Sequence, residues 1–199
     1  MAAARARGEH VTAALVVALA GLAGSIPFGL LLARRRGVDI RAQGSGNIGA
    51  TNVTRVLGPR LGALVLVLDA GKGAGPIVLA RHLGQAPSVI AVVGAAAILG
   101  HCFSPWLRLR GGKGVATALG VFVVLDPLLA ALGGGVFVLV LAVTRVPALG
   151  SLAGTATVAA GLAARAPTPL ALLGAGTLAL LVYTHRGNLA RLRAKVSGR

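Results

Sequence analysis

The chain has 199 residues, of which 56% are hydrophobic and 12% charged, and its mean hydropathy is +0.85. A soluble domain would carry about twice that charged share, so the composition excludes an ordinary soluble protein and predicts a single integral-membrane domain over residues 1–199. The net charge of +16 would suggest nucleic acid in a soluble protein, but aromatic residues are only 3% and the basic residues lie between apolar runs; this pattern indicates topology signals and anionic lipid or phosphate ligands, with no nucleic-acid partner.

The apolar runs are expected to be transmembrane α-helices, because only helices and closed barrels satisfy the backbone in lipid and these runs do not alternate as barrel strands would. The sequence predicts an all-α membrane protein of about seven spans. They cover residues 11–33, 61–80, 89–107, 114–125, 128–143, 148–164 and 170–183. Pro27 is expected to kink the first span, and the polar loop 34–60 is long enough for one or two short interfacial helices.

Seven spans place the two termini on opposite sides of the membrane. The side that holds loops 34–60, 108–113 and 144–147 and the basic tail, about 186–199, carries most of the lysines and arginines. The positive-inside rule therefore predicts an external N-terminus and a cytoplasmic C-terminus. All the glycine-rich basic loops then emerge on the cytoplasmic face.

The densest polar motif is Gly44-Ser-Gly-Asn-Ile-Gly-Ala-Thr-Asn52. Glycines allow a ligand close to the backbone N–H groups, and such a loop suits a phosphate. Its candidate phosphate-binding residues are Gly44, Ser45, Gly46, Asn47, Thr51 and Asn52, with Arg55 beside them. The motif matches G-x-G-x-x-G, but no strand precedes it, which argues against a dinucleotide site. A plain flexible connection between helices stays open as the alternative.

A second motif is Arg110-Gly-Gly-Lys-Gly114. Lys113 can act as a point charge on phosphate between Gly112 and Gly114. It is not a Walker A loop, because glycine follows the lysine where serine or threonine is required. The alternative is that these charges only fix topology.

Three ionisable residues fall inside apolar spans: Asp69 and Lys72, which share one helix face, and His101. Charged residues within a membrane face inward and are usually functional. We expect these three residues either to position the residues that contact the ligand or to stabilise helix packing.

The third motif is His185-Arg-Gly-Asn188 at the end of the last span. Histidine is suited to acid–base chemistry near neutral pH, although an anchor for anionic headgroups is an alternative. With four carboxylates and a single cysteine, Cys102, the sequence predicts no metal site and no cofactor.

Together these motifs resemble the PlsY family, bacterial membrane glycerol-3-phosphate acyltransferases that use acyl phosphate. The resemblance rests on Ser25-Ile-Pro-Phe-Gly29, 44–58, Asp69-x-x-Lys72-Gly73, Gly100-His101 through Thr117, and His185 to Asn188, in that order along the chain.

The resemblance implies seven helices and a multi-pass protein of the bacterial inner (plasma) membrane with a cytoplasmic active site. It implies transfer of a fatty acyl group from acyl phosphate to the sn-1 hydroxyl of glycerol 3-phosphate, giving lysophosphatidic acid for phospholipid biosynthesis. His185, Ser45 and Asn188 then match catalytic positions, and Arg55, Lys113 and Ser151 match substrate-binding positions.

Two further questions stay open from the sequence. A phosphate or organophosphate transporter is the alternative function, although it would place charges at the bilayer midplane and show repeats, and we find no repeat. A soluble acyl-phosphate synthase is a candidate partner for the basic face, besides the two substrates and membrane lipid.

Overall fold

The computed structural model describes residues 2–198, which form nine α-helices and one short 3-10 helix. In chain order they are α1 (Ala2–Ser25), α2 (Phe28–Arg34), α3 (Ala50–Leu57), α4 (Pro59–His82), α5 (Pro87–Cys102), η1 (Pro105–Leu107), α6 (Val115–Leu125), α7 (Pro127–Thr144), α8 (Pro147–Arg165) and α9 (Thr168–Val196). The described part of the chain contains no strand. This confirms the predicted all-α class.

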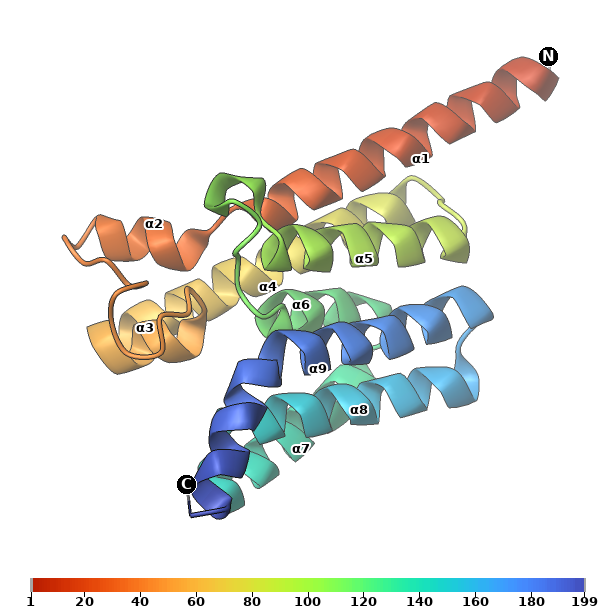
Figure 1. Cartoon of the computed structure of the whole chain (residues 1–199). Coiled ribbons are helices and arrows are strands. Elements are labelled where there is room, and N and C mark those ends of the chain that lie inside the picture. Colours follow the sequence, from red (N-terminus) through yellow and green to blue (C-terminus); the bar gives the residue numbers. More distant parts are fainter. Residues whose placement is uncertain (1, 199) are drawn as a thin grey trace.

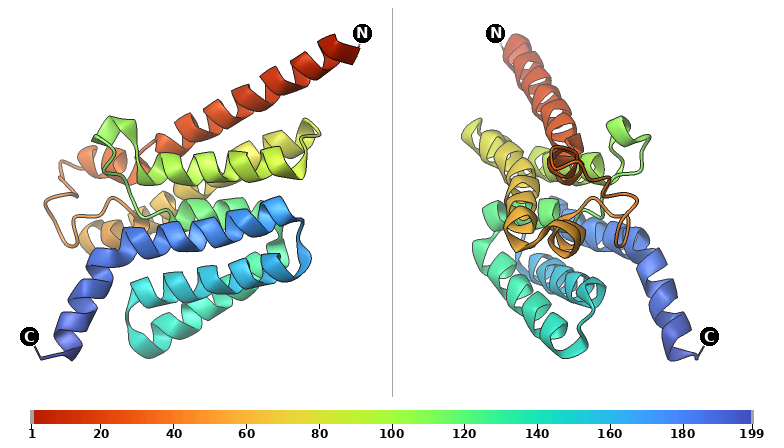
Figure 2. Two further views of the ribbon diagram at one scale, coloured as in Figure 1. Left: turned by 45° about the vertical axis from the view of Figure 1, so that its right-hand side comes forward. Right: turned by 90° about the vertical axis from the view of Figure 1, so that its left-hand side faces the viewer.

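The long helices run side by side, so that the connections gather at two ends of the bundle (Figure 1). The glycine-rich loop before α3, the loop between α5 and α6, the α7–α8 turn and the C-terminus lie at one end. The N-terminus and the α4–α5, α6–α7 and α8–α9 turns lie at the other, as the left view in Figure 2 shows. We call the first the loop end. The three polar motifs therefore meet at one end of the bundle.

Within the described part of the chain, six segments are long and apolar enough to cross a membrane: 8–34, 59–82, 87–107, 127–144, 147–165 and 168–194. The fourth predicted span, 114–125, corresponds to α6, an apolar helix of 11 residues, which is shorter than a bilayer crossing. The count of seven and the orientation of the termini therefore stay predictions.

The first predicted span is two helices, because the backbone breaks at Ile26-Pro27 between α1 and α2. Proline lacks an N–H and disfavours helical geometry in the residue before it. The carbonyls freed by the break find side-chain donors: Ser104 Oγ donates to Ser25 O at 2.7 Å, and Lys72 Nζ donates to Ile26 O at 2.8 Å. The break is therefore satisfied by residues far away in the sequence.

The last helix differs from the prediction, in which the seventh span ended near residue 183. Helix α9 continues to Val196 and changes direction as it leaves the bundle at the loop end (Figure 1). Gly187 alone does not end a helix, since it costs only about 1 kcal/mol relative to alanine. His185 and Asn188 are thus held on a helix.

Helices α4 and α6 pack closely against each other because each has a glycine at the contact. A Cβ on Gly73 would overlap the carbonyl oxygen of Thr117, and one on Gly120 would overlap that of Ala70. Small residues allow such close approach between helices in lipid. This contact fixes the position of α6, whose first residue follows the Gly-Gly-Lys-Gly motif.

Replacing Gly73 with alanine is expected to lower stability by about 1–3 kcal/mol, because the added methyl overpacks the α4–α6 contact. Gly71 on the same helix is exposed, and a Cβ there would meet nothing within 4 Å. Gly71→Ala is therefore the matched control and should be neutral or slightly stabilising. Thermal unfolding of both variants in detergent would measure the difference, and equal melting temperatures would contradict this account of the packing.

Candidate active site

The glycine-rich motif forms a tight loop that leads into α3. Gly44 and Gly46 have φ angles of +59° and +71°, a region that side chains rarely adopt. A Cβ on Gly44 would also overlap the side-chain oxygen of Asn52. The backbone of the loop therefore requires glycine at both positions.

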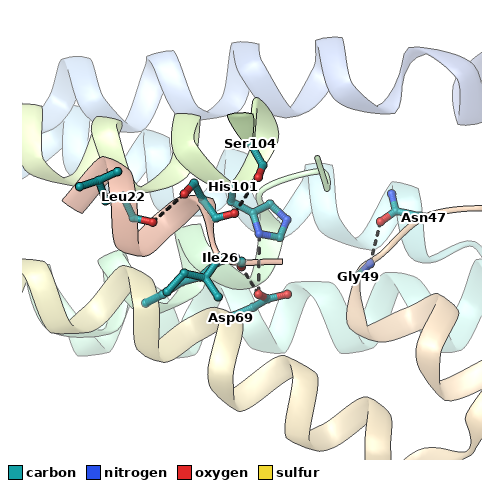
Figure 3. A network of polar contacts seen from close by, with 9 residues as sticks. Leu22, Ile26, Asn47, Gly49, Asp69, His101 and Ser104 are labelled. Atoms are coloured by element: carbon teal, nitrogen blue, oxygen red, sulfur yellow. Dashed lines mark hydrogen bonds and ion pairs between the residues drawn. The ribbon is translucent and has the colours of Figure 1, made fainter. Parts of the chain in front are cut away.

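Asn52 holds this loop together from the first turns of α3. Its Oδ1 accepts a hydrogen bond from the Ser45 N–H at 2.8 Å, and it is only 2% exposed. Its Nδ2 donates to the backbone carbonyls of Ile40, Gln43 and Asn47. Asn47 Oδ1 in turn accepts from the Gly49 N–H at 2.8 Å (Figure 3). This network favours a built loop over a plain flexible connection, and it commits the Asn52 amide to holding the loop.

The Gly-Gly-Lys segment is fixed against the end of α5. The N–H groups of Gly111 and Gly112 donate to the carbonyls of Cys102 and His101, each at 3.0 Å. A Cβ on Gly112 would overlap the His101 ring, so only glycine fits there. Gly114, at φ +92°, then turns the chain into α6.

Helix α9 holds Lys113 by two contacts. Thr184 Oγ1 donates to the Lys113 carbonyl at 3.0 Å, and Lys113 Nζ donates to Asn188 Oδ1 at 2.6 Å. One contact fixes the lysine backbone and the other its ammonium group. The second and third motifs are thereby joined directly.

His185 lies between these two contacts on α9 and is 3% exposed. Its Nδ1 is 2.8 Å from the Leu181 carbonyl. A carbonyl can only accept, so Nδ1 carries the proton and Nε2 of the neutral ring is left with its lone pair. The ring is therefore oriented so that Nε2 can accept a proton.

A cavity of about 820 Å³ opens beside these residues. Helices α3 to α9 all contribute to its wall, α5 through His101. The predicted site residues on the wall are Ser45, Asn47, Thr51, Asn52, Arg55, Asp69, His101, Lys113, Ser151, His185 and Asn188. The remainder of the wall is largely apolar, with Leu66, Phe122 and Phe137 among it. The cavity thus combines a polar end with an apolar body.

A second, smaller hollow of about 230 Å³ shares Ser45, Asn47, Lys113 and Asn188 with the cavity. Three arginines complete it: Arg41, Arg110 and Arg191. None of the residues that line this arginine hollow is acidic. The arrangement suits an anion, and Lys113 stands on the wall common to both spaces.

Burial lowers the pKa of Lys113 below its ordinary value of 10.5, and the positive charges of Arg191 and Arg55 lower it further. An uncompensated cluster of cations is costly. A bound dianion would neutralise it, so the charge distribution favours a phosphate-bearing ligand.

Asp69, Lys72 and His101 form a buried group beside the cavity. Asp69 and His101 reach the cavity wall and face one another (Figure 3). Asp69 Oδ1 is 2.8 Å from Lys72 Nζ and 3.8 Å from His101 Nδ1. The Lys72 ammonium also lies 5.7 Å from the centre of the Phe28 ring, next to the α1–α2 break. Lys72 therefore connects α4 to the helix break and does not line either space.

The structure brings most of the sequence-predicted residues to one place. Gly46 lines only the arginine hollow, whereas Gly44, Gly112, Gly114 and Lys72 line neither space and act through the backbone or through neighbours. Among the described residues there is no group of three His, Cys, Asp or Glu that could hold a metal.

Sequence reasoning did not select Thr184 or the three arginines of the hollow. Thr184 precedes the histidine motif directly, but its bond to Lys113 spans 71 positions. Arg41, Arg110 and Arg191 are spread over three segments, so nothing in their spacing indicates that they meet.

Comparison with known proteins identifies close relatives. The family model described as glycerol-3-phosphate acyltransferase matches residues 14–195. The glycerol-3-phosphate acyltransferase of Myxococcus xanthus is 58% identical over 193 residues, covering 95% of this chain and 100% of that protein. The one from Geobacter sulfurreducens is 46% identical, covering 93% and 96%.

Two solved structures are also similar. Both are crystal structures of PlsY (YgiH), an integral membrane glycerol 3-phosphate acyltransferase. The glycerol 3-phosphate form has a TM-score of 0.89 and 39% identity, and the lysophosphatidic acid form has 0.87 and 38%. Each alignment covers 92% of this chain and 93% of the other.

Proposed function

The chain belongs to the glycerol-3-phosphate acyltransferase family, and on that premise we propose that it transfers a fatty acyl group from an acyl phosphate to the sn-1 hydroxyl of glycerol 3-phosphate. The products are 1-acyl-glycerol 3-phosphate and inorganic phosphate. Membership of the family favours this enzyme over the transporter alternative, and the multi-pass helical bundle agrees with a membrane enzyme.

The observation that carries the proposal is that the cavity and the arginine hollow adjoin one another and share a wall that includes the Lys113 ammonium. An acyl phosphate and glycerol 3-phosphate both bear phosphate, so two anions must lie close together. The cavity offers an apolar body for an acyl chain, and the arginine hollow adjoins it across Lys113 and Asn188. Arginine and lysine side chains offset the repulsion between the two anions.

In the proposed reaction the sn-1 oxygen attacks the acyl carbon of the mixed anhydride. The new ester C–O bond forms as the bond between that carbon and the phosphate oxygen breaks, and phosphate leaves with the electron pair. Holding the two groups in contact supplies catalysis by proximity. Phosphate is a good leaving group, so the reaction requires no covalent acyl-enzyme.

We assign roles to the residues on the shared wall. Lys113 and Arg55 neutralise phosphate charge, and Ser45 and the Asn188 amide are positioned to donate hydrogen bonds to substrate oxygens. The hydroxyl proton goes either to His185 Nε2 or to an oxygen of the acyl phosphate. Ser151, on the α8 side of the cavity, donates its hydroxyl to Pro147 O at 2.9 Å and faces the same space.

The loop end is proposed to face the cytoplasm of the bacterial inner membrane. The exposed arginines of loop 34–41 and of α9 support this orientation through the positive-inside rule. Water-soluble glycerol 3-phosphate would then enter through the arginine hollow. A soluble acyl-phosphate synthase that docks on this basic face is the partner we propose for donor supply.

The decisive experiment measures phosphate release by purified protein with palmitoyl phosphate, with and without glycerol 3-phosphate, and repeats the assay with palmitoyl-CoA. We expect release that depends on glycerol 3-phosphate and no acyl transfer from palmitoyl-CoA. NMR of the product should place the ester at the sn-1 oxygen. Activity with palmitoyl-CoA alone would overturn the donor assignment, and an sn-2 ester would overturn the acceptor assignment.

Arg191 offers a separate test of the arginine hollow. Arg191→Gln should raise KM for glycerol 3-phosphate about fivefold and leave kcat little changed. A change of about fivefold is the most that an ion pair with an exposed side chain usually contributes to binding. Arg193 is two residues further along α9, exposed, and does not line the hollow. Arg193→Gln is therefore the matched control. An equal rise of KM in both variants would mean that the tail acts only by its overall charge.

A further inference from the structure

The apolar body of the cavity follows α8 away from the loop end. Its α8 lining begins at Pro147 and reaches Val158, a separation of eleven residues along the helix and therefore about 16 Å at 1.5 Å per residue. Leu119 and Phe122 of α6 also line it. This length and this apolar lining are suited to an extended hydrocarbon chain.

Helix α7 contributes a run of three glycines, Gly133-Gly134-Gly135, to this region. The three occupy different environments. A Cβ on Gly133 would lie 2.7 Å from both Gly154 O and Val158 Cγ2, so this glycine serves the close contact between α7 and α8. Gly133 is therefore required for packing.

Its two neighbours have no such packing role. A Cβ on Gly134 or on Gly135 would meet nothing within 4 Å. Gly134 is half-buried and lines the cavity, whereas Gly135 is exposed and is not part of the cavity wall. A side chain at position 134 would therefore project into the empty space of the cavity, and one at 135 would project away from it.

We propose that Gly134 is a specificity-determining residue, which keeps the cavity wide enough for a long acyl chain. This inference rests on the proposed function, because it takes the acyl group of the donor to be the occupant of the cavity. The α7–α8 glycine contact holds the wall in place, so α7 cannot retreat from an added side chain without breaking that contact. A larger residue at 134 must then shorten the space that an acyl chain can fill.

The test compares Gly134→Val and Gly134→Leu with the matched controls Gly135→Val and Gly135→Leu. Each variant is assayed with palmitoyl phosphate and octanoyl phosphate at saturating glycerol 3-phosphate. Both positions lie in the same helix, so the cost of a branched residue to the helix is the same. The measured quantity is the ratio of kcat/KM for the long donor to that for the short donor.

We expect this ratio to fall about tenfold or more in the Gly134 variants, which is the discrimination that a hydrophobic pocket gives for one or two methylenes. The Gly135 variants should keep the wild-type ratio. An unchanged ratio in the Gly134 variants, or an equal fall in both series, would overturn the inference. Gly134→Ala adds a single methyl, and it should give a smaller fall of the same sign if the larger variants do not fold.

The experiment separates this inference from the proposed function. Wild-type protein that uses neither acyl phosphate contradicts the donor assignment, whatever the variants do. Wild-type protein that uses both donors, with Gly134 variants that keep the wild-type ratio, leaves the donor assignment intact and removes only the role of Gly134.

Discussion

Replacing Lys113 with methionine is expected to reduce kcat/KM at least about 100-fold. The Lys113 ammonium stands on the wall shared by the two spaces and is hydrogen-bonded to Asn188. Removing one donor that stabilises developing charge typically costs about 100- to 1,000-fold. The rate of phosphate release with palmitoyl phosphate and glycerol 3-phosphate measures the loss.

The fold should survive this change. Gly111 and Gly112 hold the segment through backbone bonds, and Thr184 bonds the Lys113 carbonyl rather than its side chain. Lys113→Met should therefore keep its melting temperature. Lys113→Arg retains the charge but not the compact ammonium geometry, so intermediate activity is expected. Activity of Lys113→Met within a few-fold of wild type would contradict the role of this lysine.

The same residue predicts a pH dependence. Burial and the nearby Arg191 and Arg55 place the Lys113 pKa below 10.5 in the unliganded protein. As pH rises through that lowered pKa, the ammonium loses its proton, and KM for glycerol 3-phosphate should rise. Arginine stays charged throughout this range, so Lys113→Arg should remove the alkaline rise in KM. If wild type and Lys113→Arg show the same pH profile of KM, the rise of KM at alkaline pH comes from another group.

The second large effect concerns the buried pair Asp69 and Lys72. Each side chain is 3% exposed, and the ion-pair distance is 2.8 Å. Asp69→Asn or Lys72→Met alone should lower the free energy of unfolding by about 3–5 kcal/mol, because each leaves one buried charge without its partner. The double variant should cost much less than the sum of the two, since no unpaired charge remains. Unfolding of all four proteins in detergent gives the coupling energy.

The surface pair Asp126 and Arg165 is the matched control for this cycle. Arg165 Nη2 lies 2.6 Å from Asp126 Oδ2, but the two side chains are 46% and 24% exposed for Arg165 and Asp126, respectively. Such a pair is worth about 0–1 kcal/mol. Asp126→Asn keeps an N-cap side chain for α7, where Asp126 accepts from the Leu129 N–H. At the surface pair, the losses in free energy of unfolding of the two single variants should add up to that of the double variant. The same additivity at Asp69 and Lys72 would contradict burial as the source of the coupling.

The helices themselves were predictable from the sequence. Continuous apolar runs bounded by proline and polar loops locate them, and α4, α5, α7 and α8 each begin on a proline, which is suited to the first helical position. The number of predicted spans and the distribution of lysine and arginine among the loops predicted that the three polar motifs share one end of the bundle. The structure places them together at that end (Figures 1 and 2). Local chemistry is enough here because hydrophobicity and proline geometry act over a few residues.

The role of each site residue depended on the tertiary structure. Asn52 looked like a ligand residue, yet its amide holds the loop around Ser45. Lys72 looked like a partner of Asp69 only, yet it also satisfies the carbonyl at the Pro27 break. The approach of Arg191 to Lys113 and the empty space beside Gly134 have no local signature.

The sequence by itself therefore determined the membrane-helical class, the motifs and the family resemblance, since each is encoded in residue type and short-range spacing. Only the packed bundle decided which side chains line the cavity, which side chains support the loops, and which glycines allow close helix packing or keep the cavity open. Several of those assignments depend on contacts between residues far apart in the sequence, such as Lys72 with Ile26, 46 positions apart, and Ser104 with Ser25, 79 positions apart. Such contacts exist only once the helices have packed, because no local propensity brings these groups within hydrogen-bonding distance.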